Sequence, residues 1–165
     1  MKIAQMNRTT LDIAFCYPLF DKVYYTEPVG ILALSSFLKE NGFTTYVDDG
    51  FLKGFSCEET LHSILRKHPT IIGVSITCAR EVEDANKFSK AVKSAGFTGL
   101  MIAGGDFAGF HKDELLDTGL YHAIILGEDE LALLEFMSAV FTHENIDKIK
   151  GVATLRVYSK TIFFQ

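Results

Sequence analysis

The sequence lacks the features that would assign it to a secreted, membrane or nucleic-acid-binding class. Its three cysteines are odd in number and lie far apart along 165 residues, unlike a disulfide framework or a zinc-binding spacing. No apolar run is long enough to cross a bilayer, and the N-terminus lacks the basic and then apolar layout of a signal peptide. The net charge of −5 disfavours a nucleic-acid surface. We therefore expect a cytoplasmic protein that binds neither membrane nor nucleic acid.

Familiar nucleotide-binding motifs are missing as well. Neither G-x-G-x-x-G after the first predicted strand nor GxxxxGK[ST] occurs. A receiver-type phosphorylation domain would carry its acidic pair after the first strand, whereas Asp48 and Asp49 follow the second. A flavodoxin would place a Ser/Thr-rich loop where this chain has Cys16, Tyr17 and Pro18. These absences disfavour nucleotide- and flavin-binding domains, which stay a weak alternative.

What the sequence does contain is a regular alternation of short apolar runs and amphipathic segments. Strands are predicted at residues 11–16, 44–47, 70–75, 100–103 and 123–126. Helices are predicted at residues 28–41, from Ser56 with Glu59 in a capping box, from Val82 to Ala95, at 111–117 and at 128–141. Such alternation is typical of a parallel sheet covered on both faces.

We therefore predict an α/β fold: a three-layer, open, doubly wound, Rossmann-like sheet of five strands in the flavodoxin-like order. The expected domain spans residues 11–145, after an N-terminal extension at 1–10 and before a C-terminal pair of β-strands at 146–165. The strand-to-helix loops hold most of the unusual residues, including Gly50, Gly54 and the pair at 104–105, which permit positive φ or close backbone approach. Ligands of open parallel sheets lie outside the carboxyl ends of the strands. A ligand is expected there, with plain turn chemistry as the alternative.

Five blocks in order resemble one family over nearly the whole chain. They read EPVGILALSSFLKENGFTTYVDDG, IIGVSITC, MIAGGDFAG, AIILGEDELALLEF and KGVATLRV. Together they are similar to the cobalamin-binding domain at the N-terminus of cobalamin-dependent radical SAM enzymes. The resemblance implies a cobalamin-binding, cobalt-carrying module for a methyltransferase or a related radical enzyme.

The resemblance places the family's D-x-H-x-x-G loop after the second strand, where this chain has Asp49, Gly50, Phe51 and Gly54. The position of the cobalt-ligating histidine is then Phe51, whose phenyl ring has no lone pair for a metal. The implied cofactor is therefore base-off cobalamin with no protein axial histidine. Phe51, with Phe55, Phe107 and Phe110, is expected to cover the apolar lower face of the corrin.

The resemblance assigns the other cofactor-binding positions to three loops: Ser75, Thr77, Gly104, Gly105, Asp106, Gly127, Glu128 and Glu130. In the family, the hydroxyls line the pocket for the buried nucleotide tail, and the glycine pair lets that tail slide between sheet and helix. The resemblance also implies that, in the turn from Gly127 to Glu130 after the fifth strand, backbone N–H groups at a helix N-terminus face the ligand.

Each of these residues also has a plainer structural interpretation. Asp49 can hold its own turn, Ser75 and Thr77 can cap a helix, and the acids after the fifth strand complement a helix dipole. The chain has no C-x-x-x-C-x-x-C motif, so S-adenosylmethionine and an iron–sulfur cluster are expected only in a partner catalytic domain, in cis or in trans. No catalytic residue and no metal ligand are assigned to this chain. The alternative function is a degenerate Rossmann-like interaction or regulatory domain that binds no corrin.

Overall fold

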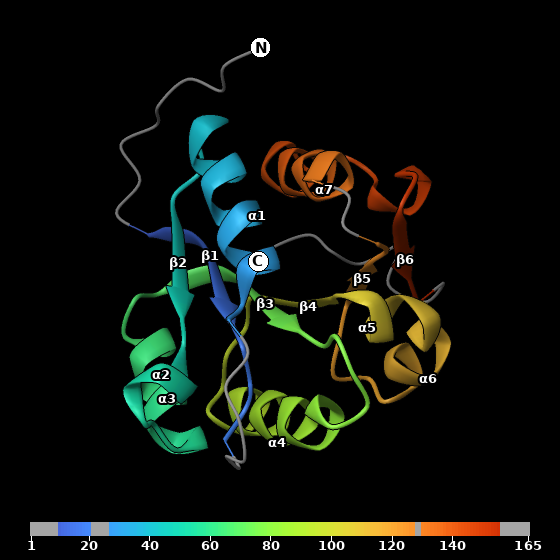
Figure 1. Cartoon of the computed structure of the whole chain (residues 1–165). Coiled ribbons are helices and arrows are strands. Elements are labelled where there is room, and N and C mark those ends of the chain that lie inside the picture. The colour runs from blue at the N-terminus through green and yellow to red at the C-terminus, as the bar shows by residue number, and fades with distance from the viewer. Residues whose placement is uncertain (1–9, 21–26, 128–129, 156–165) are drawn as a thin grey trace.

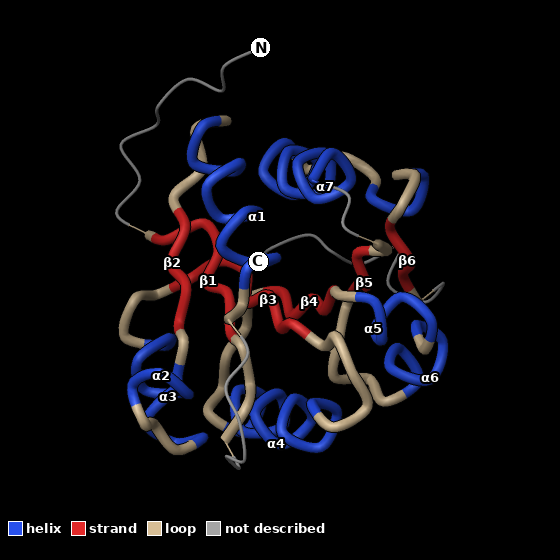
Figure 2. Tube along the Cα trace, viewed as in Figure 1, coloured by secondary structure: helices blue, strands red, loops and turns tan. Residues whose placement is uncertain are grey.

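The computed structural model describes residues 10–20, 27–127 and 130–155, and these form an open sheet with helices on both faces (Figures 1 and 2). The strands are β1 (Leu11–Cys16), β2 (Thr45–Asp48), β3 (Pro69–Ser75), β4 (Leu100–Gly104), β5 (Ala123–Ile125) and β6 (Val152–Thr154). The sheet order is β2-β1-β3-β4-β5-β6. The first five strands are parallel and β6 pairs antiparallel with β5.

This topology confirms the doubly wound Rossmann-like fold and the flavodoxin-like order of the first five strands. The strand order reverses between β1 and β3, which makes their carboxyl ends the topological switch point where ligands of such sheets bind. β6 lies within the predicted C-terminal β extension and widens the sheet to six strands. Residues 1–9 and 156–165 of the two predicted extensions lie outside the described residues.

The helices are α1 (Val29–Glu40), α2 (Gly50–Lys53), α3 (Cys57–Leu65), α4 (Glu81–Ser94), α5 (Asp106–Phe110), α6 (Lys112–Asp117), α7 (Glu130–Thr142) and a 3-10 turn, η1 (Ile146–Lys148). Helices α1 and α7 cover one face of the sheet, and α3 and α4 cover the other (Figure 1). Two apolar clusters result, because side chains alternate between the faces along each strand. Phe15 and Ile102 pack toward α1 and α7, while Cys16 and Ala103 pack toward α3 and α4.

Local sequence explains most helix boundaries. The predicted capping box at α3 is present: the Glu59 amide donates to Ser56 Oγ (3.3 Å), and the Ser56 amide donates to Glu59 Oε2 (2.8 Å). Helix α7 begins at Glu130, while Glu128, where we predicted its start, lies outside the described residues. No helix of the described part is long and apolar enough to span a membrane.

Two short helices fall where the sequence predicts loops. Helix α2 forms because the Asp49 carboxylate caps it and Gly54 ends it in the left-handed region at φ 69°. Helix α5 follows directly from Gly105, whose φ is 105°. Both helices are too short to show a helical period in the sequence, so the prediction of loops was wrong.

Candidate functional site: a pocket at the switch point

A pocket of about 300 Å³ lies between the sheet and helices α1 and α7, at the carboxyl ends of the strands. The central strands β1, β3, β4 and β5 form one wall and the two helices form the other. Its lining residues are Phe15, Val29, Gly30, Ile31, Ala33, Leu34, Gly73, Val74, Ser75, Thr77, Ile102, Ala103, Gly104, Gly105, Asp106, Ile125, Gly127, Glu130 and Leu133. The pocket therefore lies at the topological switch point, where such a fold binds ligands.

The pocket exists because two inward-facing positions of the sheet carry no side chain. Strand alternation places Gly73 and Gly104 on the face that packs against α1 and α7. A Cβ at Gly104 would meet only Ile125 atoms, at 3.6 Å and beyond, so the space above this residue is open. A Cβ at Gly73 would lie 2.9 Å from the Phe15 ring, so the missing side chain there lets Phe15 pack close to β3.

Ser75 gives this apolar pocket a free hydroxyl. The residue is 9% exposed and lines the pocket at the end of β3, beside Gly104 of β4. Its hydroxyl has no hydrogen-bond partner within the described part of the chain. Because Ser75 lines the open pocket and its hydroxyl is not engaged by the described residues, the hydroxyl is available to a ligand.

Thr77 has a different role from Ser75, although both line the pocket. Its hydroxyl donates to both carboxylate oxygens of Glu81, at 3.0 and 3.1 Å, and its amide donates to the same carboxylate. The sequence left open that Thr77 caps the following helix, but α4 has no side-chain cap hydrogen bond, and Thr77 donates instead to the side chain of its first residue, Glu81. Thr77 shapes the pocket wall, and its hydroxyl is already engaged.

Four more predicted positions meet at the same pocket. Gly105 needs its glycine, because at φ 105° a Cβ would lie 2.7 Å from the Ile76 carbonyl oxygen. Gly127 also has a positive φ, 71°, and Asp106 and Glu130 add exposed carboxylates to the lining. Among the residues that the structure describes, no lysine, arginine or histidine lines the pocket. The pocket thus offers backbone groups, one free hydroxyl and hydrogen-bond acceptors to a largely apolar ligand.

The turn after β2 does not join this pocket. Asp49 was predicted to bind the cofactor, with a role in its own turn as the alternative. Its carboxylate accepts a hydrogen bond from the Leu52 amide at 3.0 Å and so caps α2. Gly50 packs so closely on α3 that a Cβ would lie 2.3 Å from Thr60 Oγ1. Phe51 is half-buried and Gly54 ends the helix, and neither lines the pocket.

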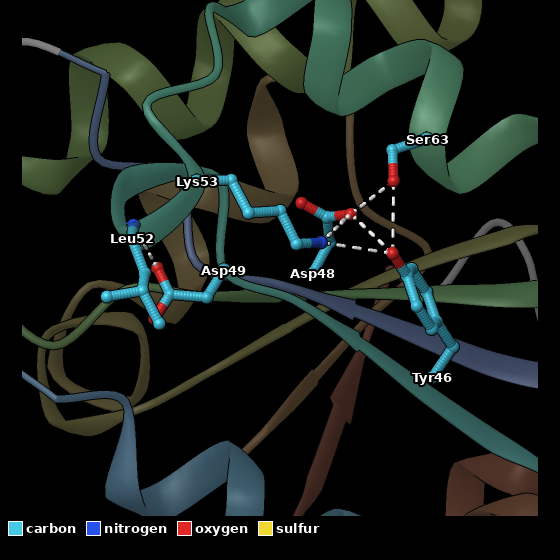
Figure 3. Close-up of polar contacts among 6 residues, drawn as sticks. All are labelled: Tyr46, Asp48, Asp49, Leu52, Lys53 and Ser63. Carbon is cyan, nitrogen blue, oxygen red and sulfur yellow. Dashed lines mark hydrogen bonds and ion pairs between the residues drawn. The ribbon is translucent and has the colours of Figure 1, made fainter.

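An ion pair between the exposed Lys53 and the buried Asp48 anchors this turn instead (Figure 3). Asp48 is fully buried, and its Oδ2 accepts from Lys53 Nζ (3.0 Å), Tyr46 Oη (2.8 Å) and Ser63 Oγ (2.5 Å). Partial burial lowers the pKa of Lys53, but its bonds to Tyr46 and Asp48 outweigh burial and raise that pKa above the ordinary value. The network fixes α2 against β2 and α3, on the other side of the sheet from α1.

Sequence reasoning missed the helical wall of the pocket. Val29, Gly30 and Leu34 of α1 line it, together with Phe15 of β1. Gly30 was the available indication, since glycine in the first turn of a long helix costs about 1 kcal/mol relative to alanine and a Cβ there would touch nothing within 4 Å. The amphipathic pattern of α1 shows which face is apolar, but not that part of this face stays uncovered.

Exposed apolar side chains gather near the same edge of the sheet. Within residues 10–20, 27–127 and 130–155, the large ones are Val29, Leu32, Leu52, Phe110 and Leu131. Each lies on the first helix after a parallel strand. Of the predicted aromatic cover, Phe110 is 87% exposed, whereas Phe107 stacks on His111 with ring centroids 4.1 Å apart.

Fold and pocket together define an open α/β domain that binds a ligand at its switch point. The B12 binding domain family model matches residues 21–137, which is well over half of the chain. The chain belongs to the B12 binding domain family. A comparison with curated protein sequences gives no match.

Solved structures with a similar fold include two proteins that were determined with a cobalamin bound. The radical S-adenosylmethionine methyltransferase TsrM from Kitasatospora setae, with cobalamin and a [4Fe-4S] cluster bound, superposes with a TM-score of 0.77 at 15% identity, over 88% of this chain and 27% of that one. The cobalamin-dependent S-adenosylmethionine radical enzyme OxsB, with aqua-cobalamin and S-adenosylmethionine bound, gives 0.72 at 16% identity, over 92% of this chain and 22% of that one. The chain thus spans about a quarter of the length of these proteins.

Proposed function

We propose that this chain binds cobalamin without a histidine ligand to cobalt, and that it serves as the cofactor domain of a radical SAM methyltransferase or a related radical enzyme. The observation that carries the proposal is the pocket at the switch point of a chain that belongs to the B12 binding domain family. Seven of its lining residues were expected from the family resemblance: Ser75, Thr77, Gly104, Gly105, Asp106, Gly127 and Glu130.

The pocket suits the nucleotide tail of cobalamin and is too small for the corrin ring. A flat, largely apolar base fits a narrow slot between sheet and helix, and the free Ser75 hydroxyl provides one hydrogen bond to it. The corrin would then lie outside the carboxyl ends of the strands. Asp106 and Glu130 lie at this edge as acceptors for the N–H groups of its amide side chains.

The proposal of no histidine ligand rests on the sequence, since the family's D-x-H-x-x-G loop has Phe51 at the histidine position. A phenyl ring has no lone pair to give to cobalt. Cobalamin supplies cobalt-centred methyl transfer, and a cobalt without a protein imidazole below it reaches a lower coordination number more easily. The prediction that Phe51 and the turn 49–54 lie beneath the corrin stays a prediction, and the position of the pocket does not support it.

Catalysis would belong to a partner. The chain has only three cysteines, Cys16, Cys57 and Cys78, and they do not form the cluster motif of radical SAM enzymes. S-adenosylmethionine and the iron–sulfur cluster are therefore proposed for a catalytic domain, in cis or in trans. We propose that residues 11–145 are the cobalamin-binding unit and that the segment 146–165 leads toward that domain.

Cobalamin binding is tested by mixing the purified chain with hydroxocobalamin, desalting the mixture and recording the visible spectrum. We expect the corrin absorption to stay with the protein. After reduction, EPR of the bound cob(II)alamin is expected to show no nitrogen coupling, from either a protein imidazole or the cofactor's own base. Nitrogen coupling would contradict base-off binding without histidine, and a colourless protein would favour an interaction domain that binds no corrin.

A further inference from the structure

Glu81 is a buried carboxylate that the proposed cofactor site does not use directly. It is the first residue of α4, is 3% exposed and is not part of the pocket lining. Its oxygens accept from the Tyr17 hydroxyl (3.1 Å), the Thr77 hydroxyl (3.0 Å), the Thr77 amide and the Cys78 amide (3.3 Å). Burial of a carboxylate is costly unless several donors compensate, so these bonds hold their donors firmly.

The donors come from two loops on either side of the topological switch point. Tyr17 follows β1, whereas Thr77 and Cys78 follow β3. A second bond joins the first loop to α4, because the Phe20 amide donates to Asp84 Oδ2 at 2.9 Å. The first turn of α4 therefore ties together the two loops that flank the site.

The bonds to Thr77 extend to the pocket wall. The Thr77 methyl carbon would lie 3.2 Å from a Cβ at Gly105, and both residues line the pocket. The backbone between β3 and Thr77 is joined to the next loop: the Ile76 amide donates to the Gly104 carbonyl (2.8 Å), and the Ala108 amide donates to the Ile76 carbonyl (3.1 Å). Movement of Thr77 would therefore change the shape of the slot beside Gly105.

We propose that Glu81 is a positioning residue for the nucleotide tail: it holds Thr77 against Gly105 and so fixes the width of the pocket. This inference rests on the proposed cobalamin function. Glu81 would act on the tail and not on the corrin ring, because its contacts reach the pocket wall. A carboxylate that only stabilises the N-terminus of α4 would not distinguish the two parts of the cofactor.

The test compares two corrinoids, cobalamin and cobinamide, which has the same ring but lacks the nucleotide tail. Glu81→Gln keeps the shape of the side chain and loses the charge that strengthens all of its bonds. We expect cobalamin to bind about tenfold more weakly to this variant, since a charged hydrogen bond is worth roughly a factor of ten or more. The affinity for cobinamide is expected to change by less than about twofold, because the ring lies outside the slot.

The control is Glu83→Gln, which removes the same charge from the same helical turn at an exposed position. It is expected to leave both affinities unchanged. A second variant, Thr77→Val, removes one donor to Glu81 and keeps the methyl group against Gly105. Because the Thr77 amide still donates to Glu81 in this variant, we expect a smaller loss of cobalamin affinity, of about threefold. The variant tests the inference if Glu81→Gln fails to fold.

Failure of the inference differs from failure of the proposed function. If the unmodified chain retains neither corrinoid, the proposed function fails. If it retains cobalamin, the inference is overturned by unchanged cobalamin affinity in both Glu81→Gln and Thr77→Val, or by equal losses for cobalamin and cobinamide. A loss of cobalamin affinity in either variant, with the affinity of the same variant for cobinamide unchanged within about twofold, supports it.

Discussion

Ser75 and Gly104 are direct neighbours across β3 and β4, and both face the same pocket. One provides a hydroxyl without a partner in the described part of the chain, and the other provides empty space where a core side chain would normally lie. This pairing of one free donor with one missing side chain is what makes the interior of the sheet suitable for a flat ligand. Substitutions of Gly104 and of Ser75 are therefore expected to have different effects.

Replacing Gly104 with leucine should fill the slot. The expected result is a loss of cobalamin binding of about 10-fold or more, since overfilling a packed site costs about 1–3 kcal/mol. The measurement is corrinoid retained after desalting, followed by titration of the visible spectrum. Gly104→Ala is the matched control: its Cβ would make ordinary contacts of 3.6 Å with Ile125, so we expect a change of about twofold or less. Unchanged binding in the leucine variant would show that the tail does not enter here.

Ser75→Ala separates ligand binding from stability. Because the hydroxyl has no partner in the described residues, the unliganded protein should unfold at the same temperature, while cobalamin affinity falls about threefold to tenfold with the loss of one hydrogen bond. The matched variant is Ser63→Ala, on the other face of the sheet, where the hydroxyl donates to the buried Asp48. Its expected pattern is the reverse, with a lower unfolding temperature and the same affinity. If Ser75→Ala and Ser63→Ala changed cobalamin affinity and unfolding temperature in the same way, the assignment of Ser75 to ligand binding and of Ser63 to stability would be refuted.

Lys53→Met should destabilise the turn after β2 at neutral pH. It removes a cation from the fully buried Asp48, but the Lys53 side chain is 37% exposed and solvent screens the pair, so we expect about 1 kcal/mol in urea unfolding. The pKa of Lys53 is raised in the folded chain, above its ordinary value of 10.5. Its stabilisation is therefore complete below pH 10.5 and lost as the pH rises through the folded value. If the unfolding free energies of the unmodified chain and Lys53→Met differ as much above the raised pKa as at neutral pH, this assignment is contradicted. The control is Lys90→Met, on the exposed surface of α4.

His122 should make the fold sensitive to mild acid. Its Nδ1 accepts the Met101 amide at 3.0 Å, and burial lowers its pKa below the ordinary 6.5. A lowered histidine pKa means that the neutral form is favoured in the folded chain, so its stabilisation is present above pH 6.5 and lost as the pH falls through the folded value. Unfolding free energies measured from pH 7.5 to 5 are expected to fall with a smaller slope in His122→Asn. An unchanged slope would contradict the assignment, and the exposed His62→Asn is the control.

The fold was largely predictable because its signals are local and repeated. The strand Leu11–Cys16 and the Ser56–Glu59 capping box appear as expected, since apolar runs and caps act over a few residues. The short helices α2 and α5 did not appear in the sequence pattern, because an Asp cap and nearby glycines are also typical of turns. Whether such a turn closes into a helix depends on packing, as Gly50 against Thr60 illustrates.

The candidate site was predictable only in part. Ser75, Gly104 and Gly105 were expected from the family blocks, and the pocket brings them together. The contribution of α1, such as Gly30, was missed because it depends on how a helix lies over the sheet. The placement of Phe51 beneath a cofactor relied on a loop that the structure holds by its own polar network, away from the pocket.

The two outermost strands of the sheet are short: β2 has four residues and β6 has three. A neighbouring chain would therefore find only a few backbone groups to pair with at either border, which discourages the edge-to-edge stacking that leads parallel sheets to aggregate. Docking of the proposed catalytic domain would then depend on side-chain surfaces, such as those around Leu52 and Phe110, and not on continuation of the sheet.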